Sequence, residues 1–244
     1  MIGVSFRMFI RQITSDSMLV MCCVAPVLAG LLFHFGIPAA DMLISQYFGH
    51  TVLKNWYLLF DLFLAVLTPF LICFASAMVM LEERDEGVAT YVLVTPLGKN
   101  GYLVSRLLVP AVIASVVSLG ILIIFRLSTL SFLQMIFLSF AIIPIALCVA
   151  LIITSFSGNR IEGMAMGKLS GLILVGVVIP FFVTSSFRFF AAFLPTFWLA
   201  EALLSPGVIS VTAFCLISLL WLYVLWYLNG DRVLSGPVAG TTST

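Results

Sequence analysis

Charged side chains are scarce in this sequence, and that scarcity indicates its class. Asp, Glu, Lys and Arg make up 9% of the 244 residues, against about 25% in typical soluble domains. Hydrophobic residues make up 63%, and the mean hydropathy is +1.26. Such a chain has too little polar surface to cover a soluble globule, so we predict an integral membrane protein. The net charge of +1 excludes the strongly basic surface of a nucleic-acid-binding protein, and we expect no nucleic-acid partner.

Residues that could bind a metal or form a disulfide are also few. The two histidines, His34 and His50, lie far from any cluster of cysteines or carboxylates. We therefore expect no metal site, no catalytic residue and no cofactor in this chain. The five cysteines all lie inside apolar runs and form no CxxC pair, which is typical of small buried side chains: Cys22, Cys23, Cys73, Cys148 and Cys215.

A nucleotide-binding P-loop is lacking as well. The nearest approach to GxxxxGK[ST] is GMAMGKL at 163–169, which has one residue too few between the glycines and a leucine where the motif needs a hydroxyl. We therefore expect that the chain does not hydrolyse ATP. Gly163, Gly167 and Gly171 recur at a spacing of four, which favours close packing of a helix against a neighbour. A hinge at a cytoplasmic contact is the alternative.

Long uncharged runs dominate what remains. A helix needs about 20 apolar residues to cross a bilayer. Spanning segments must also satisfy their backbone hydrogen bonds internally, and no run shows the alternation of a membrane barrel. The sequence therefore predicts an all-α integral membrane protein with a single transmembrane domain over 1–244. Its six spans lie at about 18–37, 56–81, 107–125, 132–155, 169–187 and 208–228.

The basic residues predict how the spans are oriented. With the N-terminus in the cytoplasm, only Lys54, Arg126 and Arg188 lie outside the cell, which agrees with the excess of basic residues expected in cytoplasmic loops. Both termini are therefore predicted to be cytoplasmic. The basic residues on that side are Arg7, Arg11, Arg84, Lys99, Arg106, Arg160, Lys168 and Arg232.

The segment at 1–16 has the pattern of an amphipathic helix. Arg7 and Arg11 lie away from an apolar face that is formed, at helical spacing, by Ile2, Phe6, Phe9, Ile10 and Ile13. This pattern predicts a helix that lies in the headgroup layer, with its arginines on lipid phosphates. A plain surface helix packed on the bundle is the alternative.

The segment at 82–106 opens with the most concentrated charge in the chain, EERDEG at 82–87. Its carboxylates, Glu82, Glu83, Asp85 and Glu86, are typical of a helix N-terminus, where the helix dipole favours negative charge. An apolar stripe follows at helical spacing and stops before Pro96: Val88, Tyr91, Val92 and Thr95. An acidic helix start with an apolar stripe that faces no lipid predicts a docking surface for another protein.

These residues resemble a known family. EERDEG, an apolar run, TPLG at 95–98 and a basic re-entry at Arg106 resemble the first intracellular loop of ABC type-2 exporter permeases. The order of elements along the whole chain is also similar: an N-terminal interface helix, six spans, and a cytoplasmic loop between the second and third. The outer segment at 188–206, broken by Pro195, looks like the re-entrant segment of that family.

The resemblance implies a function and a site. The chain would be one permease half that pairs with a second, identical or related half and binds P-loop ATPase subunits, which hold ATP and Mg²⁺. The cargo would be a hydrophobic or amphipathic drug, antimicrobial peptide or lipid, exported across the plasma membrane. The coupling loop would contain Glu82, Glu83, Asp85, Glu86, Gly87, Tyr91, Thr95 and Pro96, with a second cytoplasmic contact at Arg160 and Glu162.

Asp61 is a carboxylate inside the second predicted span, about one and a half turns from its outer end. An unpaired charge in a span costs up to about 3 kcal/mol. We expect either an ion pair with Lys54, Arg126 or Arg188, or a gate residue that faces the substrate. Arg188 and Glu201 in the outer segment have the same two interpretations.

Other functions fit the sequence less well. Glu82 and Glu83 match part of the EExxxR motif of CAAX-type membrane proteases, but position 87 is glycine where that motif has arginine. A secondary transporter is expected to show repeats and charges at the middle of the membrane, and neither is found. A channel or a structural scaffold without an ATPase partner is the alternative to the exporter.

Overall fold

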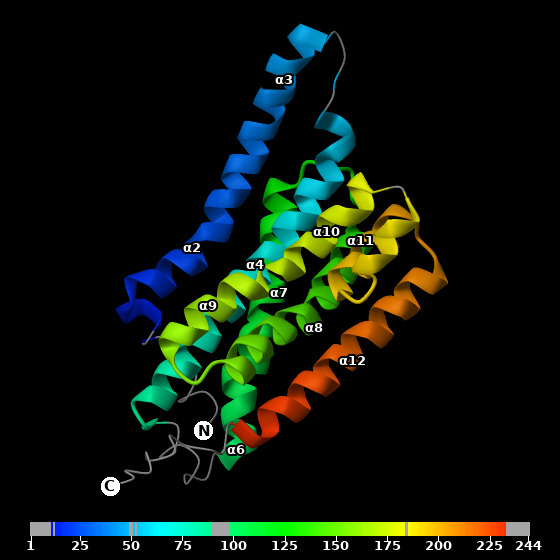
Figure 1. Ribbon diagram of the computed structural model, residues 1–244. Coiled ribbons are helices and arrows are strands. Elements are labelled where there is room, and N and C mark those ends of the chain that lie inside the picture. The colour runs from blue at the N-terminus through cyan, green and yellow to red at the C-terminus, as the bar shows by residue number, and fades with distance from the viewer. Residues whose placement is uncertain are drawn as a thin grey trace, which may run out of the picture.

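The computed structural model describes residues 11, 13–48, 51, 53–88, 98–183 and 185–232, and in this part of the chain every regular element is a helix (Figure 1). Helices that cross the bundle are interrupted in places by π or 3₁₀ turns. Their bounds are α2 (Ser17–Leu31), η1 (Leu32–Gly36), α3 (Ile37–Phe48), η2 (Leu53–Trp56), α4 (Tyr57–Asp85), α6 (Gly98–Leu103), η3 (Val104–Leu108), α7 (Val109–Phe125), α8 (Phe132–Phe156), α9 (Arg160–Ser170), α10 (Leu172–Phe182), η4 (Ser186–Ala191), α11 (Pro195–Leu204) and α12 (Val208–Arg232).

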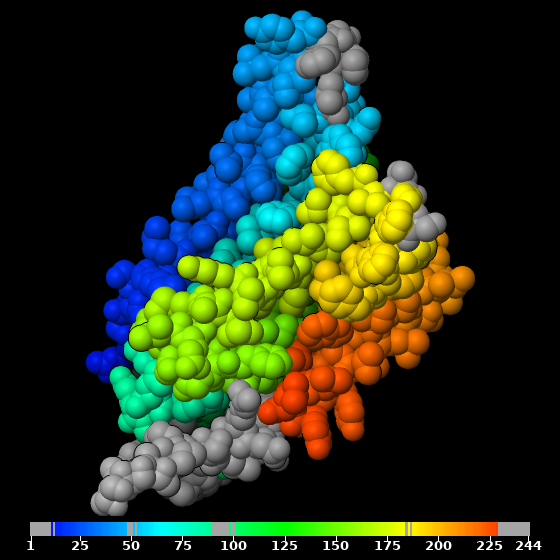
Figure 2. Space-filling view, viewed as in Figure 1, coloured from blue at the N-terminus to red at the C-terminus, as the bar shows by residue number. Residues whose placement is uncertain are grey.

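Six helical stretches within the described residues are long and apolar enough to cross a membrane, which confirms the predicted all-α, six-span fold. α4 is the central helix and contacts α2, α7, α8, α9 and α10. Within the most apolar 18 residues of each span, 67% are buried in the span that contains α4. The corresponding share is 17% in the span that begins with α2 and 22% in α12. These outer helices lie at the surface of the bundle (Figure 2), and their exposed apolar side chains are what a bilayer would cover.

The first helix is longer than the predicted span at 18–37. α2, η1 and α3 run on from Ser17 to Phe48, so that the π turn precedes Pro38 and the helix continues beyond it. Asp41 lies in α3, beyond the predicted end of the first span. Its side chain is buried in α3 and accepts a hydrogen bond from the backbone N–H of Leu53 at 2.8 Å. This bond ties the end of the first long helix to the start of the second.

The third and fifth spans also begin earlier than predicted. Helix precedes α7 from Gly98 onward, and α9 begins at Arg160 although the fifth span was predicted from 169. Asn159 caps α9 by accepting from the backbone N–H of Glu162 at 2.9 Å, and the Glu162 carboxylate accepts from the N–H of Gly158 at 2.7 Å. Hydrophobicity alone missed this polar first part of the helix because its mean hydropathy is low, while caps determine where a helix starts.

Glycines bring α9 directly onto α4. A Cβ at Gly163 would lie 2.3 Å from Cδ1 of Leu81, and one at Gly167 would lie 2.2 Å from the Phe74 ring. The predicted packing role is confirmed for these two glycines, because any side chain there would push the helices apart. Gly171 has a different place, between the end of α9 and the start of α10.

The segment after α10 folds back onto the bundle. Within the outer segment at 188–206, α11 packs against α10, α12 and α8. The Thr196 hydroxyl donates to the carbonyl of Ile173, near the start of α10, and a Cβ at Gly176 would lie 2.2 Å from the Thr196 oxygen. α11 therefore lies alongside α10, as Figure 1 shows.

Candidate functional site: the charged end of the bundle

The acidic cluster at 82–86 lies at one end of the bundle, which we call the charged end. The charged end comprises Asp16, residues 82–88, residues 98–106 and residues 157–162. Glu82, Glu83 and Asp85 occupy the last turn of α4, not the helix N-terminus that the sequence predicted. The helix dipole disfavours carboxylates at a C-terminus by about 0.3–1 kcal/mol each. Basic partners from other elements offset this cost, and the local sequence of 82–87 contains no sign of them.

Glu83 is paired in the interior. Its carboxylate accepts from the Arg106 guanidinium through both oxygens, with Nε to Oε2 at 3.0 Å, and from the Tyr102 hydroxyl at 3.0 Å. The two charged side chains are only 4% and 6% exposed. The Arg106 carbonyl in turn accepts from the Ser76 hydroxyl. This buried pair fixes α6 and η3 against α4, so Glu83 is not available to a partner protein.

Arg160, at the start of α9, joins two other segments. Its guanidinium forms ion pairs with Glu82 at 3.0 Å and with Asp16, the N-cap of α2. Its backbone N–H donates to the Asp85 carboxylate at 2.9 Å. The hydrogen bond from Arg160 holds the pKa of Asp16 below its ordinary value. The starts of α2 and α9 and the end of α4 are therefore held together by one side chain.

Arg84 binds the end of α8. Its guanidinium donates to the carbonyl of Ser157 at 3.0 Å and to that of Thr154 at 3.4 Å. Carbonyls in the last turn of a helix lack helical partners, and a basic side chain satisfies them there. The charges at 82–85 thus connect α4 with α8, α9 and η3, and Arg160 extends the connection to the start of α2.

Glu86 and Gly87 end this connected segment. The Glu86 side chain is exposed, and Gly87 has φ +73°, a conformation that favours glycine. Val88 is 38% exposed. Tyr91, Thr95 and Pro96 lie outside the described residues, as does Arg7 of the predicted interface helix; Arg11 is described and exposed. Glu162 is exposed and caps α9 as given above.

Asp61 lies at the opposite end of the bundle and forms no ion pair with a described residue. Its carboxylate accepts from the backbone N–H groups of Leu127 and Ser128 at 2.9 and 2.7 Å, and from the Ser128 hydroxyl. Two of the three expected partners bind other groups: Arg126 donates to the Leu130 carbonyl, and Arg188 is 3.6 Å from Glu201. Backbone donors replace the ion pair because the turn after α7 passes directly over Asp61, which therefore fixes the loop between α7 and α8.

Comparison with known proteins decides the family. Residues 9–229 match the family model described as "Fluoroquinolones export permease protein Rv2686c-like". The chain belongs to this family. Two relatives, the fluoroquinolones export permease proteins MT2760 and Rv2686c of Mycobacterium tuberculosis strains CDC 1551 / Oshkosh and H37Rv, are each 27% identical over 205 residues. The match covers 79% of this chain and 77% of each relative. No solved structure matches the chain.

Membership in this export permease family confirms the resemblance to ABC type-2 exporter permeases. With its six apolar helices, it makes the chain a multi-pass permease of the plasma membrane.

The sequence alone did not identify two residues of the charged end, Asp16 and Tyr102, as part of the site. Asp16 meets a side chain 144 positions away, and Tyr102 one 19 positions away, so only the fold could pair them.

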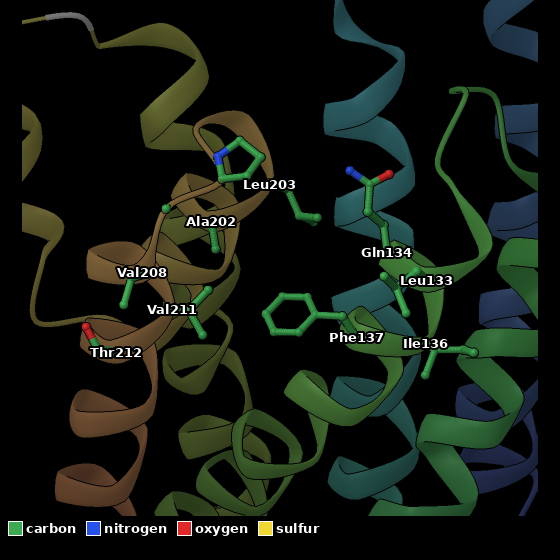
Figure 3. Close-up of a pocket in the computed structure, with 11 residues that line it drawn as sticks. Leu133, Gln134, Ile136, Phe137, Ala202, Leu203, Val208, Val211 and Thr212 are labelled. Atoms are coloured by element: carbon green, nitrogen blue, oxygen red, sulfur yellow. The ribbon is translucent and has the colours of Figure 1, made fainter.

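The permease also has apolar cavities between its helices. One of about 630 Å³ lies between α8 and the turn from α11 to α12. Figure 3 shows Phe137 of α8 directed across it toward Val211 of α12. A second, of about 500 Å³, lies near the charged end between α2, α4 and α9. The cavity at the opposite end has an almost entirely apolar lining, with Gln134 and Thr212 as its polar residues.

Proposed function

We propose that the chain is the permease half of an ATP-driven exporter that moves a hydrophobic or amphipathic compound out of the cell. Membership in the export permease family supports export. The observation that carries the ATP-driven part is the charged end, where residues 82–85 are bonded to α6, η3, α8 and α9, and where Glu86 and Val88 are exposed.

The ATPase subunit binds at the charged end, and the segment that begins at Glu86 is its docking point. A push on this segment reaches the end of α4, which Arg160 joins to α2 and α9 and Arg84 joins to α8. These helices therefore move together and not one at a time. ATP and Mg²⁺ bind to the ATPase subunit, and this chain contributes the helices that move and line the transport pathway.

This function places the charged end in the cytoplasm, with both termini on that side. Arg84, Arg106 and Arg160 lie at the charged end, and Arg126 and Arg188 lie at the opposite end, in agreement with the positive-inside rule. A second permease half, identical or related, completes the pathway. The names of the two relatives make fluoroquinolones the first substrates to test.

The test is co-purification from the native host in mild detergent, with mass spectrometry of the bound proteins. We expect a P-loop ATPase to accompany the tagged chain, and Glu86→Lys to reduce its recovery severalfold because the substitution reverses an exposed charge at the docking point. Lys54→Glu is the matched control, since it reverses an exposed charge at the opposite end. Absence of an ATPase, or equal loss in both variants, would contradict the proposal.

A further inference from the structure

We propose that the groove between α2, α4 and α9 binds one anionic phospholipid from the leaflet at the charged end. The groove encloses about 500 Å³, within the range of about 300–1,000 Å³ that is usual for small-molecule sites. Met18 and Cys22 of α2 line one wall, and Phe70 and Phe74 of α4 form the floor. Lys168 of α9 lines the other wall.

The groove follows from how the three helices meet. Asp16 and Arg160 join the starts of α2 and α9 at the charged end. Further into the membrane, Gly167 lets α9 approach α4 so closely that the Phe74 ring becomes the floor. In Figure 2, atoms of α4 (cyan) are visible between α2 (blue) and α9–α10 (lime to yellow). The groove thus opens toward the side of the bundle, and the Asp16–Arg160 ion pair closes it at the charged end.

The surface around the groove faces lipid, not water. Met21 and Leu28 of α2 are 62% and 53% exposed, and Leu169 and Leu172 beside the other wall are 57% and 61% exposed. All four lie in stretches that are apolar enough to span a membrane. An acyl chain is the apolar molecule that a bilayer supplies at such a surface.

Lys168 selects the headgroup. It is exposed, and no acidic residue in the described part of the chain forms an ion pair with it. It lies 8 residues after Arg160, which is about 12 Å along the helix. Helical side chains lean toward the helix N-terminus, which for α9 is at the charged end, and a lysine stem can extend over apolar surface to bring its ammonium to lipid phosphates there. A phospholipid with net negative charge complements both the apolar walls of the groove and the positive charge of Lys168.

The experiment is native mass spectrometry of the purified full-length chain after equilibration with equal amounts of phosphatidylglycerol and phosphatidylcholine. A lysine near an anionic surface contributes an attraction equivalent to about fivefold in binding. We expect the chain to retain one phosphatidylglycerol about fivefold more often than phosphatidylcholine. Lys168→Gln should abolish this preference, and Lys168→Arg should keep it.

Two further variants separate the site from general lipid adhesion. Lys54→Gln removes an exposed positive charge at the opposite end and should leave the preference unchanged. Met164→Trp fills the groove and should lower the retention of both lipids. A wild-type chain without preference, or a Lys168→Gln chain that folds and keeps it, would overturn the proposal. The outcome does not depend on an ATPase, so it stands apart from the test of the transport function.

Discussion

Arg160 shows at the scale of one residue how the charged end is built. Its guanidinium meets Asp16 and Glu82, and each of the ion-paired side chains is about a quarter exposed. Ion pairs at such partly exposed positions contribute about 1 kcal/mol or less each. Arg160 is important because its pairs connect the starts of two helices to the end of a third, and the energy of each pair alone is modest.

The Asp16–Arg160 pair predicts a specific pH dependence. Because the pKa of Asp16 is lowered in the folded state, its stabilising contribution is present above the unfolded-state pKa of about 3.9 and is lost as the pH falls through the folded-state pKa. Asp16→Asn should therefore lower the Tm in detergent by the same amount at any pH from 8 to about 5. The difference from the wild type should shrink at pH 3. A difference that grows on acidification would refute this role for Asp16.

The buried pair of Glu83 and Arg106 predicts a non-additive double mutant. Breaking a buried ion pair by removing one of its partners costs about 3–5 kcal/mol. Glu83→Leu and Arg106→Met should each lower the Tm strongly, while the two substitutions combined should cost much less than the sum of the single changes. Thermal unfolding in detergent measures all of these variants. Additive losses would show that the pair is not a unit.

At the scale of elements, the contact between α9 and α4 depends on glycine. Gly167→Ala would place a methyl group 2.2 Å from the Phe74 ring, so we expect a loss of about 1–3 kcal/mol of stability. Gly120→Ala in α7 is the matched control, since a Cβ there meets no atom within 4 Å and alanine favours the helix. The measurement is the Tm of both variants. Equal Tm values would mean that the Phe74 ring moves aside at little cost.

The sequence predicted where the membrane-spanning helices lie better than where they begin and end. Gaps between charged residues located all six spans, because a bilayer excludes charge over about 20 residues. Their ends were less predictable, since Asn159, Ser131 and Gly87 end or start helices through local bonds that hydrophobicity does not register. The acidic cluster was predicted at the start of a helix, and Glu82, Glu83 and Asp85 lie instead in the last turn of α4. Its partners Arg106 and Arg160 are remote in sequence, and their effect outweighs that of the helix dipole.

At the scale of the whole molecule, the two ends of the bundle differ in kind. The charged end is held by ion pairs that bridge α2, α4, α9 and η3, and it presents Glu86 outward. At the opposite end, Asp61 binds backbone N–H groups and α11 folds back onto α10. This difference is what an exporter requires if ATP acts on one face and solute leaves at the other.

The most direct measurement is fluoroquinolone uptake into inside-out membrane vesicles from the native host, with the chain present, deleted or carrying Glu86→Lys. We expect ATP-dependent uptake that disappears on deletion, falls severalfold with Glu86→Lys and is unchanged with Lys54→Glu. Uptake that needs the chain but proceeds equally without ATP would contradict it.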